Sequence, residues 1–162
     1  MRLSEIMLPE FDHEMARTRR TLAAVPADRM EWKAHESLHT IGWNANHLVD
    51  LIGWTPAITT ADEFDVAPVD GPPLKPLSIE DPVELLAEFD KNVAAAREAI
   101  VAVSDATLAE PWSLKSGGQV LFTINKGDCV RTWVLNHAVH HRAILSVLLR
   151  MAGVAVTPPY EG

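Results

Sequence analysis

Two histidines, His137 and His141, lie four residues apart in a segment whose apolar residues recur at helical spacing. Residues four apart on a helix hold their Cβ atoms about 5–6 Å apart on the same face, so both imidazoles can bind one metal ion. Two unpaired imidazoles on a core-facing stripe would lose hydration, and a shared cation compensates for that loss. The predicted inward stripe runs through Val130, Val134, His137, His141, Ile144, Leu148 and Met151.

A third ligand is needed, because two histidines on one helix rarely make a functional site. His47 is the strongest candidate, since it shares a predicted core-facing line with Trp43 and Trp54. The alternative for His47 alone is a hydrogen-bonded core histidine, the commoner state of a single buried histidine. The other histidines lie off the core stripes or in a connector: His13, His35, His39 and His140. We therefore predict a metal site made by His47, His137 and His141.

Three neutral nitrogen ligands would leave at least one coordination position open. An open position is typical of catalytic sites, whereas structural sites are saturated by four protein ligands. Nitrogen ligation favours Zn(II), Ni(II) or Fe(II) over Mg(II) or Ca(II). A water or thiol bound to such an ion becomes acidic, which gives hydroxide or thiolate near neutral pH.

Two charged side chains near the predicted ligands are candidate catalytic residues. Asp50 lies one turn from His47, where it can orient an imidazole N–H or accept a proton. Arg142 directly follows His141 and can meet an anionic group at the mouth of a pocket. The alternatives are an exposed carboxylate on a helix surface and a solvated arginine, both of which are ordinary.

The tryptophans and the single cysteine are the other notable side chains. We expect Trp43 and Trp54 to wall the pocket, because they share the helix of His47. Core or dimer contacts are the expectation for three others, Trp32, Trp112 and Trp133. Cys129 lies two turns before His137 without a nucleophile signature, so packing is its predicted role.

Four helices are expected to position these residues. The apolar spacing and the capping residues predict helices from about Ser4 to Val25, from near Thr40 to Trp54, from Asp81-Pro82 to Val103, and from Lys126 to Ala152. Ser4 is the predicted N-cap of the first helix, and Gly153 the residue that ends the last. Each helix carries one apolar stripe, so the predicted fold class is all-α, a four-helix bundle.

Two segments between the helices are not predicted to be helical. Residues 59–81 are rich in proline and acidic residues, which predicts a long surface loop that can form the rim of a pocket. Residues 110–125 place Gly117-Gly118 between two short segments, the second of them rich in β-formers. This pattern predicts a short hairpin or an extended insert just before the last helix.

Composition limits the class of protein. At 162 residues the chain is predicted to be a single domain, 1–162. Its net charge of −8 argues against nucleic acid as a partner. Cys129 is the only cysteine, which excludes an internal disulfide and a thiolate zinc site. No apolar run approaches the ~20 residues that span a bilayer, and no signal peptide is recognised at the N-terminus. We expect a cytoplasmic protein with no membrane partner.

The residues around the histidines resemble a known family. Asn46-His47-Leu48-Val49-Asp50, the run from Asn136 to Arg142 and the Pro-Pro-Tyr tail together resemble the DinB/YfiT-like superfamily of metal-dependent enzymes. The resemblance covers nearly the whole chain, and its most specific part is the final helix. It implies that the metal ligands are His47, His137 and His141.

The resemblance also implies a fold and a chemistry. The fold is an up-down-down-up four-helix bundle, often a homodimer, with a divalent ion between helices, commonly zinc or nickel. Some relatives act on small-molecule substrates with a low-molecular-weight thiol such as mycothiol, bacillithiol or glutathione.

Three functional hypotheses follow from the sequence. The leading one is a metal-dependent hydrolase or thiol S-transferase, in which the ion activates water or a low-molecular-weight thiol. The second is a non-enzymatic, metal-binding and stress-associated dimeric helical bundle. The third is a purely structural bundle without metal.

Overall fold

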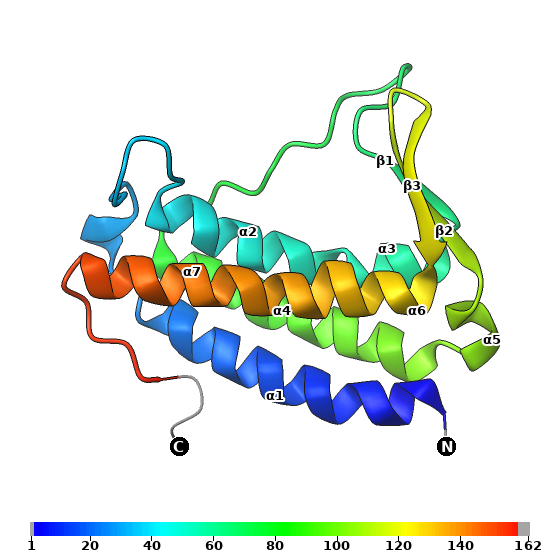
Figure 1. The fold of residues 1–162 in the computed structure, drawn as a ribbon, viewed down its shortest axis with the longest axis horizontal. Coiled ribbons are helices and arrows are strands. Elements are labelled where there is room, and N and C mark those ends of the chain that lie inside the picture. Colours follow the sequence, from blue (N-terminus) through cyan, green and yellow to red (C-terminus); the bar gives the residue numbers. More distant parts are fainter. Residues whose placement is uncertain (1, 159–162) are drawn as a thin grey trace.

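The computed structural model describes residues 2–158. Four long helical segments lie side by side (Figure 1), and the first and last point one way while the second and third point the other. These segments are α1 (Leu3–Ala23), α2 (Ile41–Gly53), α4 (Pro82–Ala102) and a final run made of α6 (Lys126–Cys129), the π-helical η2 (Val130–Asn136) and α7 (His137–Met151). Shorter helices connect them: η1 (Ala27–Arg29), α3 (Thr55–Thr60) and α5 (Asp105–Leu108). Residues 159–162 of the predicted extended tail lie outside the described part.

Two helix starts occur where the sequence predicts them. The Thr40 hydroxyl accepts a hydrogen bond from the backbone N–H of Trp43, which caps α2. The Asp81 carboxylate does the same for Val83 at the start of α4, next to Pro82 in the first helical position.

The predicted N-cap of the first helix, Ser4, is wrong. Arg2 is the N-cap residue, and Ser4 is buried within the first turn. The first backbone N–H groups of this helix donate to carboxylates. The Arg2 N–H donates to Glu5 Oε2 at 3.0 Å, and the Leu3 N–H donates to Asp105 Oδ1 at 2.9 Å. A carboxylate distant in sequence therefore lets this helix begin before the serine.

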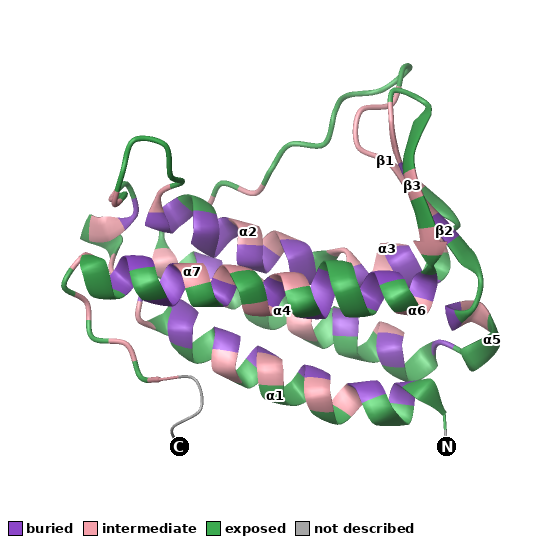
Figure 2. Cartoon of the chain, in the orientation of Figure 1, coloured by how far each residue is buried: buried purple, intermediate pink, exposed green. Residues whose placement is uncertain are grey.

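The core lies between the four helical segments, where their buried faces meet (Figure 2). α1 packs against both α4 and α7, and α2 packs against the same two helices. The buried face of α1 runs from Met7 to Leu22, and Leu3 at its start is exposed. In α4, the buried face includes Leu85, Phe89 and Ile100. Within residues 2–158, no helix is both long and apolar enough to cross a membrane.

A small sheet covers one end of the helices (Figure 1). The predicted hairpin is confirmed as β2 (Pro111–Ser116) and β3 (Gln119–Asn125), an antiparallel pair. Gly117 and Gly118 form its turn with φ values of 59° and 77°, which favour glycine. A third strand, β1 (Glu63–Asp65), pairs with β2 in parallel. Residues 59–81 are therefore not one long loop, because they contain the end of α3 and this strand.

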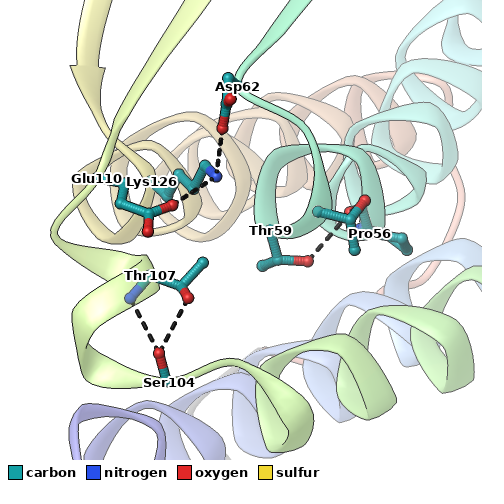
Figure 3. A network of polar contacts seen from close by, with 8 residues as sticks. Pro56, Thr59, Asp62, Ser104, Thr107, Glu110 and Lys126 are labelled. Carbon is teal, nitrogen blue, oxygen red and sulfur yellow. Dashed lines mark hydrogen bonds and ion pairs between the residues drawn. The ribbon is translucent and has the colours of Figure 1, made fainter.

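A buried lysine ties the sheet to the last helical run (Figure 3). Lys126 Nζ lies 2.9 Å from Asp62 Oδ1 and 3.1 Å from Glu110 Oε2, and its side chain is 3% exposed. Hydrogen bonding to Asp62 is the largest of the effects that raise the pKa of Lys126. Since Asp62 precedes β1 and Glu110 precedes β2, one ammonium group anchors both strands at the start of α6.

The last helical run has the predicted extent but a different inner face. Residues 130–136 form a π-helix, which has more residues per turn than an α-helix. Later side chains are therefore rotated relative to a count at 3.6 residues per turn. Leu145 and Leu149 are buried, Ile144 is half-buried, and Met151 is 61% exposed. The predicted stripe thus holds at Val130, Val134 and Leu148 but not at Met151.

Candidate metal centre

The three predicted ligands converge from two elements. Nε2 of His137 lies 3.5 Å from Nε2 of His47 and 3.1 Å from Nε2 of His141. One ligand atom from each residue lies within 4.8 Å of the others. Four-coordinate zinc holds nitrogen at about 2.0–2.1 Å, which places neighbouring ligand atoms about 3.3 Å apart. Both Nε2–Nε2 separations match that spacing.

Asn44 orients the ring of His141. The Asn44 amide is 3% exposed, and its Nδ2 donates to the Thr40 carbonyl at 2.9 Å, which fixes which end of the amide faces the histidine. Its Oδ1 lies 3.3 Å from Nδ1 of His141. Because an amide oxygen only accepts, Nδ1 of His141 carries the proton, and Nε2 presents a lone pair to the other rings.

The π-helix orients the ring of His137. The Trp133 ring lies edge-on to the His137 ring, with centroids 5.8 Å apart. Burial lowers the pKa of His137, and hydrogen bonding with the Trp133 backbone partly offsets this effect. π-Helical turns are frequent at functional sites, where they change the pattern of backbone hydrogen bonds and the direction of side chains. His137 is the first residue after the π-helix of this chain.

A row of stacked rings holds His47. Its ring centroid lies 4.7 Å from that of Trp43, at an interplanar angle of 20°. Trp43 also stacks on His39, with centroids 3.6 Å apart. This stacking limits rotation of the His47 ring about its long axis. All three candidate ligands are half-buried and sit at the edge of the core.

The surroundings keep these imidazoles neutral at neutral pH. Burial, with a further contribution from nearby histidines, lowers the pKa of His47 and of His141 to about 4. Burial also lowers the pKa of His137. Neutral imidazole is the form that binds metal. Three neutral imidazoles with Nε2 atoms this close together offer nitrogen ligands to one ion, so the residues fit a divalent cation in their midst.

A largely apolar cavity of about 110 Å³ adjoins His47 and His137, and we call it the apolar cavity. Asp50 lines it with Trp54, as predicted for that tryptophan. Burial raises the pKa of Asp50, partly offset by a hydrogen bond from Trp54. Asp50 is therefore half-buried beside a candidate ligand instead of being an exposed surface carboxylate.

Arg142 is not brought to this cavity. Its guanidinium is 3% exposed, and Nη2 lies 2.6 Å from Oε2 of Glu14 on α1. Nη1 also donates to the Glu14 carbonyl and to the Thr18 hydroxyl. Arg142 is therefore not placed to meet an anionic group at the mouth of the cavity. It is also not the solvated arginine that was the alternative.

The sequence analysis missed several residues of the site. Trp112 lies in the core as expected and also lines the apolar cavity, whereas Trp133, expected in the core or at a dimer contact, is 42% exposed and lines the same cavity. Trp43 stacks on a ligand instead of lining this cavity. Asn44 was not singled out. Its place three residues before His47, on a helix predicted to face the core, was the available signal that its amide could bond a histidine ring. Cys129 is buried as predicted, and burial raises its pKa to about 12.

Fold and site together define a predominantly helical protein with a three-histidine cluster suited to a metal. The family model described as the DinB superfamily matches residues 10–145, so the chain belongs to that superfamily. The crystal structure of a DinB-like protein from Bacillus cereus is similar, with a TM-score of 0.69, 19% sequence identity and 93% of each chain covered. At that identity the likeness concerns the fold alone. No curated protein matches the chain.

Proposed function

We propose that this protein is a divalent-metal-dependent enzyme acting on a small molecule, with His47, His137 and His141 as the metal ligands. The observation that carries the proposal is the convergence of three Nε2 atoms, with Nε2–Nε2 distances of 3.5 and 3.1 Å from His137. Zinc and nickel are the favoured ions, and iron(II) also suits nitrogen ligands.

A divalent ion held there supplies Lewis acidity, which makes a water or a low-molecular-weight thiol a nucleophile at neutral pH. The reaction classes are accordingly hydrolysis, or S-transfer when the nucleophile is a thiol. Asn44 and the Trp133 backbone hold two of the ligand rings, and the aromatic walls of the apolar cavity restrict water. We assign Asp50 the role of accepting the proton released by the nucleophile, because its raised pKa makes it a stronger base than an ordinary aspartate. Arg142 joins α7 to α1 and has no role in this chemistry.

The proposal includes a finer architecture and an assembly state. We propose an up-down-down-up four-helix bundle that forms a homodimer and resides in the cytoplasm. The opposed directions of the helices support the bundle. Exposed Val147 and Met151 on the outer face of α7 support a second copy of the chain as a partner.

Metal analysis of untagged protein tests the proposal. After incubation with Zn(II) or Ni(II) followed by gel filtration, we expect about one ion per chain, and a large loss of metal in His47→Ala and His137→Ala. His13→Ala is the matched control, because that exposed ring on α1 is outside the cluster and the variant should keep the metal. Negligible metal in the wild-type protein would reject the enzyme and the metal-binding alternative together.

Turnover separates the enzyme from a non-enzymatic metal-binding bundle. Metal-loaded protein should transfer a low-molecular-weight thiol to an electrophile, or hydrolyse an activated ester or amide, faster than the metal-free protein does. Asp50→Asn should reduce that rate while retaining the metal. Stoichiometric metal without any such rate enhancement would favour the non-enzymatic reading.

A further inference from the structure

The apolar cavity has a composition that selects among ligands. Its walls include Leu51 and Trp54 at the end of α2, Ile58 on α3, Leu114 and Phe122 on the sheet, and Trp133 on the π-helix. Phe122 and Trp133 stack with centroids 4.8 Å apart, which joins the sheet to the helix across the cavity. Aromatic and branched aliphatic walls favour an apolar group, because each apolar surface that leaves water is stabilising.

Charge excludes an anionic group from the cavity. No lysine or arginine is among its lining residues, and the one acidic side chain there is Asp50. An anion would lose its hydration against apolar walls without a cation to compensate. The nearest arginine along the ligand helix, Arg142, is already paired with Glu14.

A cationic group is a closer competitor, because aromatic faces and a carboxylate are the usual partners of an ammonium ion. One feature disfavours it. An ammonium ion would lose its hydration against apolar walls on nearly every side, because Asp50 is the one acidic side chain of the lining.

Size sets the upper limit of the group. A cavity of ~150 Å³ lined by leucine, isoleucine and phenylalanine binds benzene, and the apolar cavity is somewhat smaller at about 110 Å³. A branched alkyl chain or one six-membered ring is therefore the largest group that fits without rearrangement. A fused two-ring system requires a wall residue to be shortened.

We infer that the apolar cavity binds an uncharged hydrocarbon group of the substrate, no larger than a single six-membered ring, with the reacting end of that substrate at His47 and His137. The location of the reacting end rests on the proposed function. The hydrocarbon site itself does not, because its walls are complete without a metal ion.

Three compounds of similar shape and different charge test the inference on metal-free protein: toluene, benzylammonium and benzoate. Ligand-detected NMR titration should show toluene binding most tightly, with benzoate weaker by about tenfold or more. Absence of toluene binding to folded wild-type protein, or equal binding of either ion, would overturn the inference.

Variants at the cavity wall test its location and size. Ile58 lines the cavity and Ile100 does not, and both side chains are 1% exposed. Ile58→Ala should admit naphthalene with an affinity about tenfold above that of the wild type, whereas the matched deletion Ile100→Ala should not. Leu114→Phe should reduce toluene binding by filling the space from the sheet. Equal naphthalene binding by the two isoleucine variants would contradict the assignment.

A thiol probe tests the orientation and keeps the two proposals separable. Phenylmethanethiol should bind zinc-loaded protein about tenfold more tightly than metal-free protein, while toluene should bind both alike. Toluene binding together with a failure to load zinc would reject the proposed function and leave the hydrocarbon site intact. Zinc loading without toluene binding would reject the hydrocarbon site alone.

Discussion

Two neighbouring residues of α7 belong to opposite kinds of polar cluster. Arg142 lies in a cluster that complements itself, since its guanidinium meets the Glu14 carboxylate at 2.6 Å and also bonds Thr18. His141 lies in a cluster of like groups, with Nε2 of His137 at 3.1 Å. A self-complementing cluster stabilises the fold by itself, whereas neutral imidazoles with converging nitrogens are suited to an added cation. One helix therefore carries a structural joint on one face and a binding site on the next.

The pKa directions express the same difference. Burial acts to raise the pKa of Glu14, yet the hydrogen bond and charge of Arg142, with Arg17, bring it below its ordinary value. In the histidine cluster, burial lowers the pKa of His47 and His141, and the neighbouring imidazoles lower it further. Partners of opposite charge offset burial in the first cluster, while like groups add to it in the second.

The largest expected effect comes from breaking the self-complementing cluster. Glu14→Gln leaves the Arg142 charge buried without its carboxylate, so the free energy of unfolding should fall by about 3 kcal/mol. Urea unfolding measures this change. Asp12→Asn, at the exposed Asp12–Arg97 pair, is the matched control and should cost below about 1 kcal/mol. Unchanged stability in Glu14→Gln would mean that the two clusters do not differ as described.

The next effect concerns the histidine cluster, where stability should depend on added metal. At a free zinc concentration 100 times the dissociation constant, binding to the folded state alone adds about 2.7 kcal/mol. The melting temperature of the wild type should therefore rise with zinc and fall again with a chelator. His137→Ala should lose this response and Glu14→Gln should keep it. A zinc-induced rise retained in His137→Ala would place the metal elsewhere.

A smaller effect is expected from the partner of one ligand. Asn44→Leu removes the acceptor that holds Nδ1 of His141, so zinc affinity should fall by about 10- to 100-fold, measured by competition with a chelating dye. Asn92→Leu is the control, because that half-buried amide bonds the Val49 carbonyl and not an imidazole. Equal losses in both variants would point to general destabilisation.

The smallest effect is the pH dependence of the metal-free protein near neutrality. The pKa of His47 and of His141 is about 4 in the folded state, against an ordinary value of 6.5. The unfolded chain therefore binds more protons between these values, and the free energy of unfolding falls as the pH falls through this window. The loss should be small from pH 7 to 6 and should grow toward pH 4.

His47→Gln provides the comparison for this pH dependence. Urea midpoints measured from pH 7 to pH 5 should fall less steeply in the variant than in the wild type. Glu14 affects stability only at lower pH. Its pKa is below the ordinary value of 4.5 in the folded state, so its contribution to the free energy of unfolding is lost as the pH falls below 4.5. Parallel curves for wild type and variant would remove His47 from the titrating cluster.

Local patterns were enough to predict which three histidines lie together and most helix ends. The four-residue spacing of His137 and His141 specifies a shared face, and Thr40 and Asp81 cap helices through neighbours a few residues away. Contacts between distant segments could not be predicted in this way. The parallel pairing of β1 with β2 joins residues about 50 positions apart.

The same limit applies within the site. Asn44 is recognised only when His141 is seen beside it, and Trp133 is recognised as a cavity residue only when Phe122 of the sheet is seen stacked on it. Arg142 is recognised as a structural residue only because Glu14, 128 positions earlier, lies against it.

X-ray absorption spectroscopy of zinc-loaded, untagged protein tests the central claim most directly. Three imidazole nitrogens at about 2.0–2.1 Å from the ion, with at least one further light-atom ligand, are the predicted coordination. His47→Ala should remove one imidazole from that shell or abolish binding. A wild-type spectrum with fewer than two imidazoles would contradict a metal centre at this cluster.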